Sequence, residues 1–261
     1  MPKLHARDID LYYESTGQGQ PLLFIHGLGS STRDWEPQVP VFAARYRVVT
    51  FDVRGHGQSD KPPGPYSVPL FAADTATLIR ALDIAPAHVA GISMGGMIAF
   101  QLAVDAPELI RSLVIVNAGP EFVVRTIKER LQLLQRLLVV RLLGMRKMGE
   151  VLSKRLFLKP EQEELRQTFV ERWAENDKRA YRDAMRALVG WSVAEHLGTI
   201  DVPTLVIASD EDYTPVALKE AYVAQMPQAE LVVIEDARHA VTAERPAQFN
   251  QALLAFLTRL V

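Results

Sequence analysis

The most informative part of the sequence is HVAGISMGGMIAFQLAVD, residues 88–105. It begins with a short apolar run typical of a buried strand, and Met94–Asp105 has the length and apolar composition of a helix. Ser93 lies between them in the pattern G-x-S-x-G, and a serine on such a tight strand-to-helix turn must point outward. Glycines at 91, 95 and 96 remove side chains that would collide where the backbones approach. The stretch therefore predicts an outward serine at a helix N-terminus, where N–H groups and the helix dipole favour an anion.

Apolar runs and helical patterns alternate on both sides of this stretch. The predicted strands are Asp10–Glu14 (an edge strand), Leu22–Ile25, Val48–Phe51, a run ending at Val89–Gly91, Leu113–Val116, Thr204–Ala208 and Leu231–Ile234. The predicted helices are Asp74–Leu82, Met94–Asp105, Val216–Gln225 and Pro246–Leu260. This alternation indicates an α/β fold, with a mostly parallel sheet covered by helices on both faces.

Residues 120–197 interrupt the alternation, because they show helical patterns, many charges and no strand pattern. We interpret them as a helical cap over the C-terminal edge of the sheet, inserted into a core domain formed by residues 1–119 and 198–261. Apolar residues at helical spacing predict one buried stripe, at Ile127, Leu131, Leu134, Leu138, Leu142 and Met145. The cap holds 16 Lys/Arg against 11 Asp/Glu. A solvated outer face is the simplest interpretation of this excess, and a role at a membrane surface or with an anionic substrate is the alternative.

Composition limits the function classes. The chain has 261 residues, 48% of them hydrophobic, which is enough for one large core. A net charge of −2 gives no electrostatic reason to expect a nucleic-acid partner. The absence of cysteine excludes disulfides, thiolate nucleophiles and thiolate metal sites. The charged N-terminus does not resemble a signal peptide, and Leu131–Leu143 is too short and charged to span a bilayer, so we expect a cytoplasmic protein without a membrane span. The oligomeric state stays open.

A serine hydroxyl becomes a nucleophile only beside a base that a further group orients. With a serine on this kind of turn, the acid and then the histidine follow downstream. Only His196 and His239 follow Ser93, and His239 comes shortly after the strand Leu231–Ile234, at the same sheet edge as the serine. Three acids, Asp210, Glu211 and Asp212, follow the strand Thr204–Ala208, and spacing alone does not choose among them.

The anion formed on attack at a carbonyl needs hydrogen-bond donors. The Met94 N–H, directly after the serine, is one predicted donor of this oxyanion hole. The Leu28 N–H, in His26-Gly27-Leu28-Gly29 after the strand Leu22–Ile25, is the other. His26 is expected to be a structural hydrogen-bonding residue, and the glycine-rich turn at residues 52–59 is expected to shape the sheet edge.

The motifs HGLG, DVRGHGQS, GISMGG, SDEDYTP and RHAVTAERP together resemble those of the α/β-hydrolase family, in order and at similar intervals outside the cap. The resemblance implies the α/β-hydrolase fold and a serine hydrolase that needs no cofactor and no metal. In that family the acid stands two or three residues before a proline, which favours Asp212 before Pro215. Ser209 and Arg238 depart from the family, in which glycine is common at both places.

The loop RGHGQS followed by PGPYS is similar to that of 3-oxoadipate enol-lactonases and carboxylesterases. This similarity implies a small-molecule ester or lactone as substrate. C–C bond hydrolysis of ring-cleavage products, which uses the same three side chains, and cofactor-free haloperoxidase or perhydrolase activity are the alternatives within the family. If the protein is not an enzyme, the alternative is a non-catalytic receptor or scaffold of the same fold.

Overall fold

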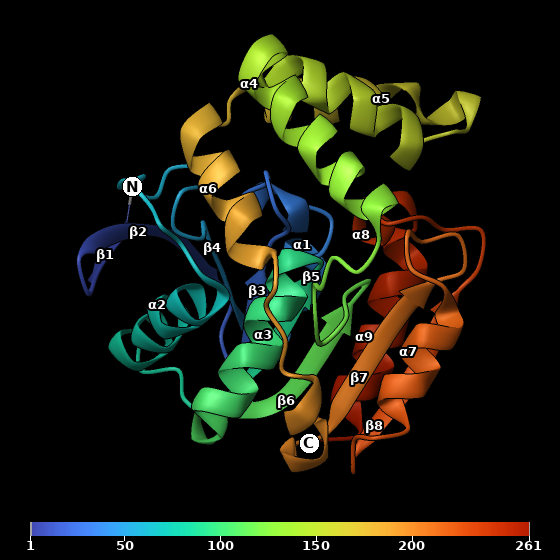
Figure 1. The fold of residues 1–261 in the computed structure, drawn as a ribbon. Coiled ribbons are helices and arrows are strands. Elements are labelled where there is room, and N and C mark those ends of the chain that lie inside the picture. Colours follow the sequence, from blue (N-terminus) through green and yellow to red (C-terminus); the bar gives the residue numbers. More distant parts are fainter. Residues whose placement is uncertain (1, 261) are drawn as a thin grey trace.

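The centre of the molecule is a sheet of eight strands in the order β1-β2-β4-β3-β5-β6-β7-β8 (Figure 1). The computed structural model describes residues 2–260. The strands are β1 (Lys3–Ala6), β2 (Ile9–Thr16), β3 (Gln20–Ile25), β4 (Tyr46–Phe51), β5 (Ala87–Ile92), β6 (Ile110–Val116), β7 (Thr204–Ser209) and β8 (Ala229–Ile234). β2 runs antiparallel to both of its neighbours, and all pairs from β4 to β8 are parallel. The predicted α/β class with a mostly parallel sheet is therefore confirmed. The expected edge position of Asp10–Glu14 is wrong, because β1 pairs outside β2.

Helices cover both faces of the sheet. They are α1 (Val39–Phe42), α2 (Val68–Ala81), α3 (Met94–Asp105), α7 (Val216–Val223), α8 (Val241–Glu244) and α9 (Pro246–Thr258). The chain also has 3₁₀ turns at η1 (Thr32–Trp35), η2 (Pro107–Leu109) and η4 (Ala194–Thr199), and η3 (Pro160–Gln162) lies in the insertion between β6 and β7. Because successive strand residues point to opposite faces, Leu23 of β3 packs in the core beneath α2 and α3, whereas Phe24 packs with Phe249 of α9. The strands are apolar on both sides for this reason.

The register of the parallel strands places their C-terminal ends at one edge. Ile25 of β3 is opposite Gly91 of β5, Gly91 is opposite Ile115 of β6, and Val116 is opposite Ile207 of β7. The loops that follow β3, β5, β7 and β8 therefore begin at the same edge. This is the edge at which open α/β sheets bind their ligands.

Three further helices are inserted between β6 and β7: α4 (Ile127–Leu156), α5 (Glu163–Ala174) and α6 (Lys178–Leu188). They lie above the sheet edge in Figure 1. A bridge between Glu121 and Ser192 joins the two ends of the insertion. The division into a core of residues 1–119 and 198–261 and a cap of residues 120–197 fits this arrangement and remains our proposal.

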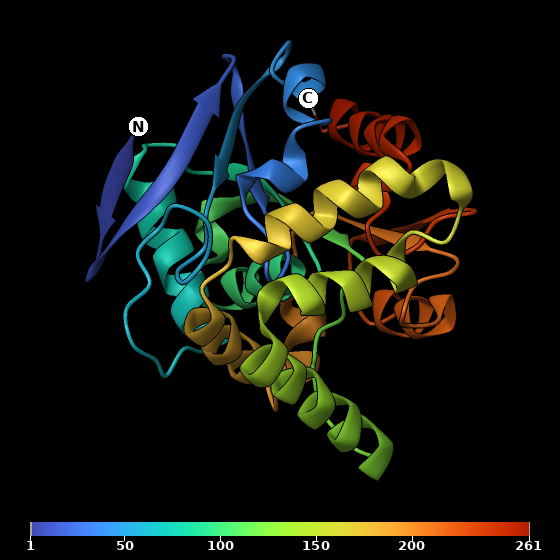
Figure 2. The ribbon, with the colours of Figure 1, turned by 90° about the horizontal axis from the view of Figure 1, so that it is seen from above.

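The predicted buried stripe of the insertion is wrong for five of its six residues. Only Met145 is buried, whereas Ile127 is 77% exposed, Leu131 60%, Leu134 52%, Leu138 42% and Leu142 72%. α4 is interrupted at Gly144, which has φ 84° and ψ −179°. The part before this kink projects beyond the rest of the molecule (Figure 2). Helical spacing identified the apolar face correctly, but it cannot tell whether a neighbour covers that face.

Within residues 2–260, no helix has both the length and the apolar composition that crossing a bilayer requires.

Candidate active site

Ser93 occupies a sharp turn between β5 and α3. Its backbone has φ 55° and ψ −117°, a region that non-glycine residues rarely adopt, and its N–H donates to the Val116 carbonyl at 2.9 Å. A Cβ atom on Gly91 would lie 2.2 Å from the Gly95 oxygen, and one on Gly95 would lie 2.1 Å from the Ile25 oxygen. The glycines thus keep the turn closed as the sequence predicts, and Ser93 directly precedes the first turn of α3.

His239 and Asp212 meet at the same edge. His239 Nδ1 lies 2.6 Å from Asp212 Oδ1, and the Asp212 side chain is fully buried. The other two acids of that loop are engaged elsewhere. Asp210 accepts hydrogen bonds from two backbone N–H groups of the loop after β8, at 3.0 and 3.1 Å, and Glu211 pairs with Arg238 at 2.6 Å. Of the three acids, Asp212 is thus the one in contact with His239, and it is also the one that the family resemblance favoured.

A third residue at Asp212 is one that the sequence did not indicate. Lys219 of α7 is 1% exposed, and its Nζ lies 2.6 Å from Asp212 Oδ2. The same ammonium donates to the Thr214 carbonyl at 2.8 Å and lies 2.7 Å from the Thr214 hydroxyl oxygen. A lysine on a helix usually lies in solvent, so no sequence pattern pointed to this contact.

Burial alone would raise the pKa of Asp212. The hydrogen bonds and positive charges of His239 and Lys219 outweigh this effect and hold the pKa well below its usual value. Asp212 is therefore ionised throughout the physiological pH range. An ionised acid at this place can orient the imidazole and stabilise the imidazolium.

Asn117, directly after β6, joins the serine turn to the histidine loop. Its side-chain nitrogen donates to the His239 carbonyl at 3.1 Å and to the Ser209 hydroxyl at 2.8 Å, and its side-chain oxygen accepts from the Ser209 N–H at 2.9 Å. The preceding residue, Val116, binds the Ser93 N–H. Two consecutive residues thus hold the loops of Ser93 and His239 at one place. The serine at 209, a departure from the family, has a structural partner here.

The predicted oxyanion loop, which we define as residues 26–29, passes beside Ser93. A Cβ atom on Gly27 would lie 3.6 Å from Ser93 Cβ. The Leu28 N–H makes no backbone hydrogen bond among residues 2–260, whereas the neighbouring Gly27 N–H donates to Asp34 Oδ2 at 3.2 Å. Asp34 also accepts from the Ser30 hydroxyl. Burial raises the pKa of Asp34, and these two donors partly oppose that rise. Sequence reasoning missed Asp34, because a single acid in the polar stretch after β3 has no distinguishing pattern.

His26 and His56 are structural, as expected. Both are fully buried, and burial lowers the pKa of His26 to about 4 and that of His56 to about 3. His26 Nε2 accepts from the Val53 N–H at 2.9 Å, so its Nδ1 donates to the Gly27 carbonyl at 2.7 Å. His26 thus links the predicted oxyanion loop to the turn that follows β4. In that turn, Asp52 accepts from the backbone N–H of Thr32 at 2.7 Å.

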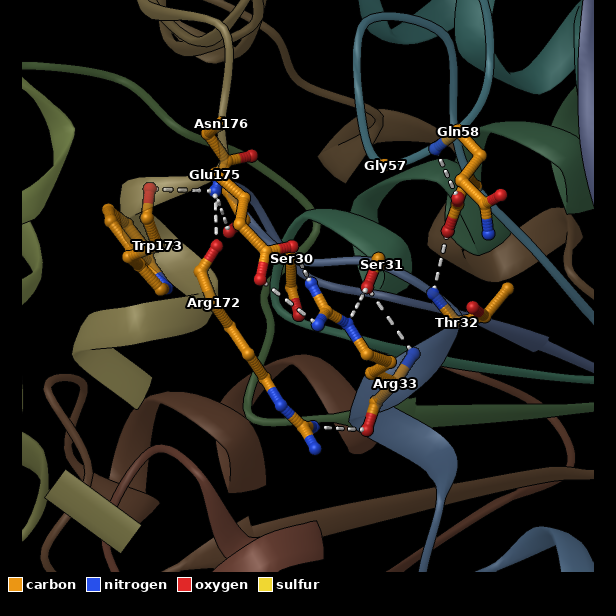
Figure 3. A network of polar contacts seen from close by, with 12 residues as sticks. Ser30, Ser31, Thr32, Arg33, Gly57, Gln58, Arg172, Trp173, Glu175 and Asn176 are labelled. Carbon is orange, nitrogen blue, oxygen red and sulfur yellow. Dashed lines mark hydrogen bonds and ion pairs between the residues drawn. The ribbon is translucent and has the colours of Figure 1, made fainter. Parts of the chain in front are cut away.

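The end of α5 is tied to the oxyanion loop through a polar network (Figure 3). Arg33 pairs with Glu175, Arg172 donates to the Arg33 carbonyl at 3.0 Å, and Asn176 donates to the Gly29 carbonyl at 2.8 Å. Gly29, with φ +76°, lies so close to Trp173 that a Cβ atom would be 2.9 Å from the indole ring. The position of the predicted oxyanion loop therefore depends on the inserted helices as well as on the sheet.

Among residues 2–260, no group of three or more His, Cys, Asp or Glu side chains is placed to hold a metal ion.

Several known proteins share the family and the fold of this chain. The family described as alpha/beta hydrolase fold matches residues 20–246. RutD of Azorhizobium caulinodans is 33% identical over 98% of each chain, and 3-oxoadipate enol-lactonase 2 of Acinetobacter baylyi is 30% identical over 98% of this chain and 96% of its own. The crystal structure of the enol-lactonase from Burkholderia xenovorans LB400 superposes with a TM-score of 0.91, at 25% identity over 98% of this chain and all of the other. The protein is therefore a member of the α/β-hydrolase family.

Proposed function

We propose that this protein hydrolyses small carboxylic esters or lactones through an acyl-enzyme on Ser93. The observation that supports this most directly is the contact of His239 Nδ1 with the buried, ionised Asp212, at the sheet edge where the serine turn also lies. The similarity to two enol-lactonases favours esters and lactones as the substrate class.

In the proposed reaction, His239 Nε2 takes the proton of the Ser93 hydroxyl while the serine oxygen attacks the carbonyl carbon. Asp212 holds the Nδ1–H, so that Nε2 is the free, basic nitrogen. His239 then gives the proton to the leaving alkoxide, and the acyl group remains on Ser93. A water molecule, deprotonated by the same nitrogen, releases the acid and restores the serine.

The developing oxyanion lies between two backbone donors in this proposal, the N–H groups of Leu28 and Met94. Met94 is the first residue of α3, where N–H groups have no partner within the helix. Such preorganised donors lower the barrier because they match the charge of the intermediate rather than that of the substrate.

The test is a substrate panel of p-nitrophenyl esters of increasing acyl length and of simple lactones, assayed with the wild type and with Ser93→Ala. We expect Ser93→Ala to lower kcat by roughly four orders of magnitude or more, with the circular dichroism spectrum unchanged. Near wild-type turnover by Ser93→Ala would reject the proposal. Assays with a coloured ring-cleavage substrate and with a halogenation substrate distinguish ester hydrolysis from C–C bond hydrolysis and haloperoxidase activity. Labelling of Ser93 by an organophosphate distinguishes an enzyme from a non-catalytic scaffold.

A further inference from the structure

The arm of α4, which we define as residues 127–143, has an exposed apolar face. Ile127, Leu131, Leu134, Leu138 and Leu142 lie on it at spacings of three and four residues, and each is between 42% and 77% exposed. Residues at such spacings share one side of a helix. Together with neighbouring residues, four of these leucines form a shallow apolar groove along the arm.

This face is not needed for packing the arm onto the protein. The opposite side of α4 faces inward: Val140 is fully buried and packs in a small core with Met145, Trp173 and Tyr181. The arm is thus apolar on two sides, and only one of them is covered by the chain. Figure 2 shows that it extends away from the sheet and from the other inserted helices, so a large surface can reach it.

The charges of α4 have one dominant sign. Residues 127–156 contain eight Lys and Arg residues and two Glu residues. Glu129 is engaged in the capping box, since its carboxylate accepts from the N–H groups of Arg125 and Thr126. Glu150 pairs with Lys147. On the arm itself, Arg130 and Arg141 lie beside the leucine face at helical spacing, and both are exposed.

We propose that the arm docks onto the surface of an anionic lipid bilayer. An exposed apolar face flanked by basic residues is the pattern of helices that lie in the membrane interface, with leucines in the acyl boundary and Lys or Arg at the headgroups. A second copy of this chain fits less well. If two leucine faces pair around a twofold axis, the arginines of both copies meet along the seam, and the arm's single acidic residue already caps its own helix.

Docking in this way would turn the inserted helices toward the membrane surface. The sheet edge that carries the proposed active site lies below these helices in Figure 1 and would be on the same side of the protein. The proposal goes beyond the hydrolase function and does not depend on it. Binding is measurable with the inactive Ser93→Ala variant, so the two proposals can fail separately.

The test is flotation of the full chain with vesicles made of equal parts phosphatidylglycerol and phosphatidylcholine, compared with vesicles of phosphatidylcholine alone. We expect the wild type and Ser93→Ala to float with the anionic vesicles at low salt and to be released at high salt. Arg130→Gln combined with Arg141→Gln should weaken partitioning about thirtyfold. Leu131→Ser combined with Leu138→Ser should weaken it by about a hundredfold or more.

Matched controls lie on other surfaces. Leu218, 57% exposed on α7, and Arg111, exposed on β6, are suitable, so Leu218→Ser and Arg111→Gln should bind like the wild type. Failure to float with anionic vesicles, or equal loss of binding in control and arm variants, overturns the proposal. Sedimentation as a dimer that the leucine variant dissociates, without vesicle binding, would assign the face to a second copy and also overturn it.

Discussion

Lys219 and His239 bind opposite oxygens of one buried carboxylate, each at 2.6 Å, so that Asp212 is shared between a lysine and an imidazole. An acid shared in this way cannot turn away from the histidine without leaving a buried ammonium unpaired, which is costly. We therefore propose that Lys219 is a positioning residue for this acid.

Lys219→Met tests this role. Loss of the ammonium removes one of the groups that orient Asp212, so we expect kcat to fall about tenfold with little change in KM. Lys219→Gln, which keeps an N–H donor, should lose less activity than Lys219→Met. Steady-state kinetics on one p-nitrophenyl ester gives both constants, and a rise in KM with kcat intact would contradict the positioning role.

Asp34→Ala should lower kcat at least about tenfold with little change in KM. The carboxylate accepts from the Gly27 N–H and the Ser30 hydroxyl, and without it the Leu28 N–H is no longer held at a fixed place for the transition state. Asp34→Asn keeps an acceptor for the Gly27 N–H and should recover most of the activity. Steady-state kinetics on one p-nitrophenyl ester is sufficient. If Asp34→Ala raises KM and leaves kcat intact, the residue contacts substrate instead.

Gly29→Ala should impair both stability and activity. The new methyl group would lie 2.9 Å from Trp173 and 3.1 Å from Tyr181, in a backbone conformation with φ +76°. We expect a loss of about 2–4 kcal/mol in the free energy of unfolding and a lower kcat/KM. Gly190→Ala is the matched control, since Gly190 has φ +84° but a methyl group there would meet no described atom within 4 Å. The control should lose only about 1 kcal/mol, which is the cost of the backbone conformation alone. Urea unfolding curves give both values, and equal losses would contradict a clash with the insertion.

The buried, neutral histidines should make the free energy of unfolding depend on pH. Burial lowers the pKa of His88 from 6.5 to about 4, and it bonds to Ser112 and Gln20 while neutral. Since the unfolded chain binds this proton first, the contribution is complete above pH 6.5 and is lost as the pH falls toward about 4. His26 and His56 act in the same direction. His88→Gln should therefore flatten the slope of unfolding free energy against pH by about 1.4 kcal/mol per pH unit within that window. Parallel wild-type and variant curves would show that His88 is not responsible.

The amino-acid sequence was sufficient to predict the helices, strands and turns that depend on residues close together in the chain. Met94–Asp105 begins and ends where the pattern indicated, and the strands differ from their predicted bounds only at the ends. The serine turn was predictable because the need for glycine at residues 91 and 95 is steric and local. β1 was missed because four residues with little apolar character have no strand pattern of their own; pairing with β2 makes them a strand.

The contacts that each side chain makes with distant residues could not be predicted from the sequence. Asp210, Glu211 and Asp212 are adjacent and chemically similar, and only the folded loops show that Asp212 contacts His239 while Asp210 binds backbone N–H groups. Lys219 lies at the acid because α7 packs behind it, and the leucines of the arm are exposed because nothing in the described chain reaches them. Periodicity and turn chemistry concern residues a few positions apart, whereas contact, burial and charge pairing depend on segments that are distant in the chain and meet only when it folds.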